Sequence, residues 1–157
     1  MRGFVLLLAL ALSATVANAD PAETCARAGN DDTVRPYDPA LRQGFVRAFK
    51  TLFPGAKGGQ SDKMMRAGAN YRCMGGKLYA CFTGADLPCA KIVAAKENPA
   101  VTRYCAEVKA TDFVPLYVVG HDTQYNYRCE AGQPVITGET WALDARGFAV
   151  KLWAPME

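Results

Sequence analysis

Six cysteines constrain this chain more than any other feature of its sequence. In a chain of 157 residues they are Cys25, Cys73, Cys81, Cys89, Cys105 and Cys129. In an oxidising compartment an even number of cysteines most simply forms three disulfides, for which 15 pairings exist. A zinc site is the competing interpretation, but the chain has no C-x-x-C pair and only one histidine, His121. We therefore expect three disulfides, no metal and no cofactor.

The first 19 residues predict export. A short positive start containing Arg2 precedes an apolar run over residues 4–16, and Ala17-Asn18-Ala19 has the small-x-small pattern of a signal-peptidase site. A retained membrane anchor is the alternative, but the run is short for a bilayer, which needs about 20 residues. We expect a signal peptide over 1–19 and an exported bacterial protein, periplasmic or extracellular, with no transmembrane segment after cleavage.

Capping signals predict two short helices. Asp38-Pro39 and Asn98-Pro99 each combine an N-cap side chain with a proline at the first helical position. Pro54-Gly55 ends the first helix, and residues 55–69, rich in Gly and Lys, predict a mobile loop. Residues 20–37 are polar and predict an irregular N-terminal arm, followed by one domain over 38–157.

A strong hairpin signal lies at Gly75-Gly76, between alternating segments at 70–74 and 77–82. A two-residue turn there places Cys73 opposite Leu78 and Cys81 opposite Asn70. The two cysteines then lie on opposite faces and cannot pair. Cys81 and Cys89 close a short loop, and we favour their pairing.

Further strands are expected at 113–119, at a sheet edge because of Pro115, at 124–129 with 134–137, and at 140–143 with 148–153. The predicted fold class is α+β: an antiparallel sheet with two short helices, stapled by disulfides.

One motif occurs twice. Asn70-Tyr71-Arg72-Cys73-x-x-Gly76 recurs as Asn126-Tyr127-Arg128-Cys129-x-x-Gly132, at an offset of 56 residues. Asp38-Pro39-Ala40 likewise matches Asn98-Pro99-Ala100. An internal duplication and chance similarity both explain the repeat.

Charge is distributed unevenly. Residues 35–96 contain eleven Lys or Arg against three Asp or Glu, although the whole chain has a formal net charge of only +3. A basic face would bind an anionic partner, an envelope glycan or an acidic protein, whereas packing of the basic part beside the acidic parts is the intramolecular alternative. The small net charge does not indicate a nucleic-acid partner.

The inventory of catalytic groups favours a protein that is not an enzyme. Ser61 is the only serine after residue 19, and no nucleophile-elbow pattern surrounds it. Asp122, Glu139 and Asp144 at strand ends leave one alternative open, a small carboxylate-dependent glycan hydrolase. We expect a non-enzymatic binding or inhibitor-type protein of the cell envelope.

Residues 70–153 carry a resemblance. The stretch from Tyr71-Arg72-Cys73-Met74-Gly75-Gly76-Lys77-Leu78 through Gly84-Ala85-Asp86-Leu87-Pro88-Cys89 to Trp153 resembles an uncharacterised family of small exported bacterial proteins. The Tyr-x-Cys-x-x-Gly hairpin at Tyr71 to Gly76 is also similar to that of the periplasmic inhibitors of C-type lysozyme. This second resemblance implies a small disulfide-bonded β-barrel and an inhibitor-type function.

A binding face is expected on the first hairpin. In the register given above, Arg72 and Tyr79 lie opposite one another on the side that also carries Lys77. The stapled loop at 84–91 lies beside it, and the candidate ligand-binding residues are Arg72, Lys77, Tyr79, Asp86, Lys91, His121 and Asp122. Two alternatives remain: Cys81 draws the loop over this face with no ligand involved, and His121 only stabilises a turn.

Overall fold

The computed structural model describes residues 20–84 and 86–157, so the predicted signal peptide lies outside the described residues. The helices are α1 (Pro21–Ala28), η1 (Pro39–Leu41), α2 (Arg42–Leu52), α3 (Asp62–Gly68), α4 (Pro99–Val108), α5 (Leu116–Val119) and η2 (Val150–Leu152). The strands are β1 (Asp31–Pro36), β2 (Ala69–Met74), β3 (Lys77–Phe82), β4 (Tyr125–Glu130), β5 (Gln133–Glu139) and β6 (Ala154–Pro155). Antiparallel pairs form one sheet in the order β1-β2-β3-β6 and a second of β4-β5. The α+β class is therefore confirmed.

The capping residues act as expected. The Asp38 side chain accepts a hydrogen bond from the Ala40 backbone N–H at 2.9 Å, and Asn98 accepts one from Ala100 at 3.0 Å. Asp20 caps α1 in the same way, so residues 20–37 form a helix and a strand, and the expected irregular arm is wrong.

Two further expectations about secondary structure are wrong. Ser61 caps α3 through the Met64 backbone N–H, so a helix occupies part of the expected loop at 55–69. Pro115 stands at the N-cap of α5, so residues 116–119 form a helical turn instead of continuing a strand. The Val-Val pair there favours strands only where a sheet can accommodate it.

The β2–β3 hairpin has the predicted register, with Cys73 opposite Leu78 and Cys81 opposite Asn70. Gly75 and Gly76 both have positive φ, as a two-residue hairpin turn requires. The expected strand pair at 140–153 is reduced to one bridge, between Leu143 and Ala149, because η2 begins at the next residue.

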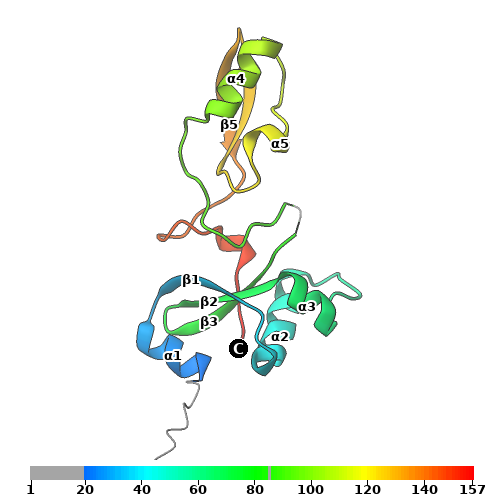
Figure 1. The fold of residues 1–157 in the computed structure, drawn as a ribbon, viewed down its shortest axis with the longest axis vertical. Coiled ribbons are helices and arrows are strands. Elements are labelled where there is room, and N and C mark those ends of the chain that lie inside the picture. The colour runs from blue at the N-terminus through cyan, green and yellow to red at the C-terminus, as the bar shows by residue number, and fades with distance from the viewer. Residues whose placement is uncertain (1–19, 85) are drawn as a thin grey trace, which may run out of the picture.

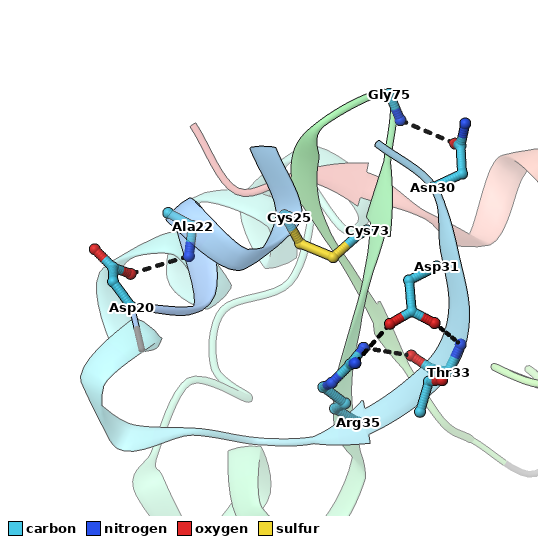
Figure 2. The surroundings of a disulfide bond; sticks show 9 residues. All are labelled: Asp20, Ala22, Cys25, Asn30, Asp31, Thr33, Arg35, Cys73 and Gly75. Carbon is cyan, nitrogen blue, oxygen red and sulfur yellow. Dashed lines mark hydrogen bonds and ion pairs between the residues drawn. A yellow bond between two sulfur atoms is a disulfide. The ribbon is translucent and has the colours of Figure 1, made fainter. Parts of the chain in front are cut away.

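The disulfides are Cys25–Cys73, Cys81–Cys89 and Cys105–Cys129. The expected Cys81–Cys89 bridge is confirmed, and Cys73 does not pair with Cys81. Figure 2 shows how Cys25 of α1 is joined to Cys73 of β2, while the Asn30 side chain accepts a hydrogen bond from the Gly75 backbone N–H at 3.0 Å. The first hairpin is thus fixed to α1 at its cysteine and at its turn.

Figure 1 shows an elongated molecule, with the four-stranded sheet and α1–α3 at one end and α4, α5 and the β4–β5 hairpin at the other. The buried residues form three clusters. The first packs α2 and α1 on the sheet around Phe45, the second surrounds Phe148 and Trp153 in the middle, and the third joins α4 to β4 around Val101 and Tyr127.

Two parts of the chain share one arrangement, which we call the first helix–hairpin unit (α1, β1, β2, β3) and the second helix–hairpin unit (α4, residues 111–114, β4, β5). In each unit one disulfide, Cys25–Cys73 or Cys105–Cys129, joins the helix to the first strand of the hairpin. Two further contacts also correspond between the units. The backbone N–H groups of Gly29 and Lys109 donate to the carbonyls of Cys25 and Cys105, and their own carbonyls accept from Gly76 and Gly132 at 2.6 and 2.8 Å. The helix that matches α4 is thus α1, not the helix after Asp38. Duplication itself stays a prediction.

Candidate functional site

Arg72, the central residue of the expected binding face, is fully buried. Its guanidinium carbon lies 3.7 Å from the centroid of the Phe148 ring and 4.8 Å from that of Trp153. The Nη2 group of Arg72 donates a hydrogen bond to the Asp144 carboxylate at 2.5 Å. The expectation that Arg72 binds a ligand is therefore wrong. Residues 141–153 and the Cys81–Cys89 loop cover this face, which fits the alternative that the covering is structural.

The Asp144 carboxylate fixes residues 144–148 over Arg72 through several hydrogen bonds. It accepts hydrogen bonds from the backbone N–H groups of Arg146 and Phe148 as well as from Arg72. Burial on its own would raise the pKa of Asp144, but the hydrogen bonds from Phe148 and Arg72 lower it below the ordinary value. Asp31 and Asp32, held by Arg35 and Arg146, also have lowered pKa values. A glycosidase general acid needs a shift in the opposite direction.

The other candidate residues do not form one surface. Lys77 pairs with Glu157 at 2.7 Å, Lys91 pairs with Asp32 at 2.6 Å, and Tyr79 is half-buried against the second cluster. The structure brings together only Asp86 and His121, at 2.9 Å, and both are exposed. Asp122 is exposed and accepts a hydrogen bond from the Val93 backbone N–H through its carbonyl. These contacts hold loops in place.

A groove beside α2 and α3 is the more promising surface, and we call it the α2–α3 groove. Its volume is about 250 Å³, and its apolar lining includes Phe49, Phe53, Ala56, Met64, Phe82 and Leu87. Phe49 and Phe82 meet edge to face with centroids 5.1 Å apart, so the floor of the groove is a packed aromatic cluster. Met64 on its rim is 57% exposed.

Glycine keeps this groove open. Gly59 has a φ of +91°, and a Cβ atom built on it would lie 2.5 Å from the Phe49 ring. A side chain there would be strained by its backbone conformation and would push the aromatic ring away. The Gly-rich segment that the sequence presents as a loop thus forms one wall of the groove.

Three exposed lysines are sequence neighbours of residues that line this groove. Lys50, Lys57 and Lys63 each follow or precede a lining residue in the sequence, and none of them takes part in an ion pair within the described residues. Arg42, by contrast, is held by Asp62 at 2.7 Å, which raises its pKa. Free ammonium groups beside exposed apolar surface can bind a ligand that is both anionic and apolar.

The α2–α3 groove was not predicted from the sequence, for an identifiable reason. The excess of lysine was visible, but the groove depends on α3 and on the meeting of α2 with β3. Ser61-Asp62, an N-cap followed by an acidic first turn, was the local signal that could have placed α3.

In residues 20–84 and 86–157 no helix combines the length and apolar character needed to cross a membrane, and no three acidic, histidine or cysteine side chains gather as a metal site. Comparison with protein-family models, curated proteins and solved structures gives no match. The three disulfides are compatible with an exported protein.

Proposed function

We propose that this chain is an exported, non-enzymatic binding protein of the bacterial cell envelope, and that it binds an anionic, acylated glycan at the α2–α3 groove. One observation carries the proposal: an open apolar groove has lining residues that are sequence neighbours of three exposed lysines, and these lysines have no ionic partner within the described residues. The apolar floor accepts part of an acyl chain, while the lysines bind phosphate or carboxylate groups of the glycan.

The chemistry of the ligand follows from the two kinds of group at this site. A purely polar glycan would leave the exposed part of Phe53 and Met64 without a partner, and a neutral lipid would leave the lysines without one. Exported proteins meet ligands with both properties at the outer envelope, where phosphorylated glycolipids are exposed. Binding should weaken as salt rises, because exposed charges are screened over about 10 Å at 0.1 M.

The test measures the affinity of the oxidised mature chain for purified lipopolysaccharide, for its deacylated polysaccharide and for polyglutamate. Replacing Lys50, Lys57 and Lys63 together by Glu should weaken lipopolysaccharide binding on the order of 100-fold, at about 1 kcal/mol for each lysine. Met64→Asp should weaken binding of lipopolysaccharide but not of the deacylated polysaccharide.

The matched control is the triple replacement of Arg27, Lys109 and Lys151 by Glu, which changes the net charge equally at exposed positions elsewhere. This control should bind as the wild type does. Unchanged affinity of the lysine variant would overturn the proposal, and tighter binding of polyglutamate would indicate an acidic protein as the partner. Release of reducing sugar from peptidoglycan, lost on replacing Asp122 or Glu139, would instead establish the glycan-hydrolase alternative.

A further inference from the structure

The two helix–hairpin units differ in one respect that has a functional consequence. Counted from Cys73 and Cys129, Leu78 and Ala80 of β3 correspond to Pro134 and Ile136 of β5. In the first unit the outer edge of β3 is paired with β6, whereas the second sheet consists of β4 and β5 alone. The outer edge of β5 is therefore open within the described residues.

The segment on β3 shows how such an edge is filled. Ala154 pairs with Ala80, and the Met156 backbone N–H donates to the Leu78 carbonyl at 3.0 Å. The Met156 side chain is buried against Gly44 of α2, where an added Cβ would lie 2.9 Å from it. An extended segment with a small residue and, two positions later, a large apolar residue thus completes the first unit.

The equivalent surface of the second unit offers the same backbone groups. Along an antiparallel pair, the backbone groups of successive residues point alternately toward the partner strand and away from it. With the turn at 131–132, the N–H and carbonyl of Ile136 and the carbonyl of Pro134 therefore point away from β4, to the outer edge of β5. Pro134 has no N–H to donate. The N–H of its counterpart Leu78 makes no hydrogen bond to residues 156–157 either, so this difference removes no contact of the kind made on β3. Every backbone group that the segment on β3 uses has a counterpart on β5.

A groove lies beside this edge, and we call it the α4–β5 groove. Its volume is about 660 Å³, and Thr102, Tyr127, Pro134 and Ile136 are among its lining residues. The corresponding groove of the first unit, lined partly by Met156, has about 310 Å³. Ile136 is 38% exposed, and no residue that lines the second groove corresponds to Met156 of the first.

We propose that β5 binds an extended segment of a partner protein, which adds to the second sheet as an antiparallel strand. The segment places a small residue opposite Ile136 and a large apolar residue, two positions later, in the α4–β5 groove. Two basic residues, Lys96 and Arg103, and one acidic residue, Glu97, line the groove. An acidic residue in the segment is therefore preferred over a basic one. Main-chain hydrogen bonds supply affinity and the groove supplies specificity, as in other strand-addition complexes.

The probe is the synthetic peptide Leu-Trp-Ala-Pro-Met-Glu, the sequence of residues 152–157, titrated into the oxidised full chain and followed by NMR. We expect saturable shift changes at the amides of Val135, Ile136 and Thr137 and along α4. The Met156→Asp version of the peptide should bind at least tenfold more weakly.

Ile136→Pro should abolish the shifts, because it removes the N–H at the open edge and leaves the pairing with β4 in place. Thr102→Phe, which fills the groove from α4, should weaken binding at least tenfold, and Glu107→Phe on the same helix should not. The lysine variant of the α2–α3 groove should bind the peptide normally, which separates this proposal from the one above.

Three results would overturn the proposal. Shift changes confined to β3 would mean that the peptide only replaces residues 152–157 of the chain on that strand. Normal binding by both Ile136→Pro and Thr102→Phe would place the peptide elsewhere. A wild-type dimer in sedimentation that becomes monomeric in Ile136→Pro would identify a second copy of this chain as the occupant.

Discussion

Arg72 is a charged residue placed where a sheet protein usually has a hydrophobic one. Its guanidinium packs against both Phe148 and Trp153, and Asp144 supplies the balancing charge. Two of its nitrogens, Nε and Nη1, have no hydrogen-bond partner in the structure. The pair with Asp144 therefore carries nearly the whole electrostatic compensation of a buried cation.

Asp144→Asn should destabilise the chain by about 3–5 kcal/mol, the usual cost of leaving a buried charge unpaired. The measurement is chemical unfolding of the oxidised chain at neutral pH. Asp62→Asn serves as the control, because the Arg42–Asp62 pair is exposed and contributes less than about 1 kcal/mol. Equal effects of the two substitutions would contradict this account of Arg72.

The same pair makes stability depend on pH. The pKa of Asp144 is lowered below its ordinary value of 3.8, so the ionised form stabilises the folded state above that pH and the contribution is lost as pH falls below it. The wild type should lose more stability than Asp144→Asn between pH 5 and pH 3. Parallel curves for the two proteins would show that other groups cause the loss.

At the scale of elements, the two hairpins have the same turn geometry but different residues. Gly75 and Gly76 form the first turn, and Ala131 and Gly132 the second, with Ala131 at a φ of +48°. An L-residue in this left-handed conformation costs roughly 1–2 kcal/mol, partly offset by the greater flexibility of glycine in the unfolded chain.

Ala131→Gly should therefore stabilise the β4–β5 hairpin by about 0.5–1 kcal/mol, and Gly75→Ala should destabilise the β2–β3 hairpin by a similar amount. Hydrogen exchange of the strand amides resolves the two effects. A loss of protection in β4–β5 on Ala131→Gly would contradict the strain argument.

Local signals predicted these elements well, and tertiary contacts explain the failures. The caps at Asp38 and Asn98 and the glycines at 75–76 act within a few residues, so α2, α4 and the hairpin register were predictable. The burial of Arg72 depends on residues 141–153, which follow it by some 70 positions in the sequence. No periodicity in β2 could show that both faces of this strand are covered. The α2–α3 groove was missed for the same reason, since α2 meets β3 only in the folded chain.

At the scale of the molecule, both tryptophans, Trp141 and Trp153, lie in the middle cluster. The second helix–hairpin unit has its own cluster and its own disulfide, and it joins the rest through two connections near Val93 and Thr140. Tryptophan emission therefore reports mainly on the middle of the molecule.

Replacing Cys105 and Cys129 by serine should remove about 3–4 kcal/mol of stability from the second unit. Far-UV circular dichroism should then show an early transition that tryptophan emission does not follow. Replacing Cys81 and Cys89 should instead shift the emission transition. Coincident transitions by both methods in the Cys105/Cys129 variant would show that the chain unfolds as one domain, as expected for residues 38–157.

The cover over Arg72 and the strand on the β3 edge come from residues 141–156, whereas the sheet they complete ends at Phe82. A chain that emerges from its N-terminal side therefore forms β2 and β3 long before either surface can be closed. During that interval the nascent hairpin presents an open strand edge and an aromatic-binding arginine to its surroundings. Such long-range closure is slow and exposes the chain to aggregation.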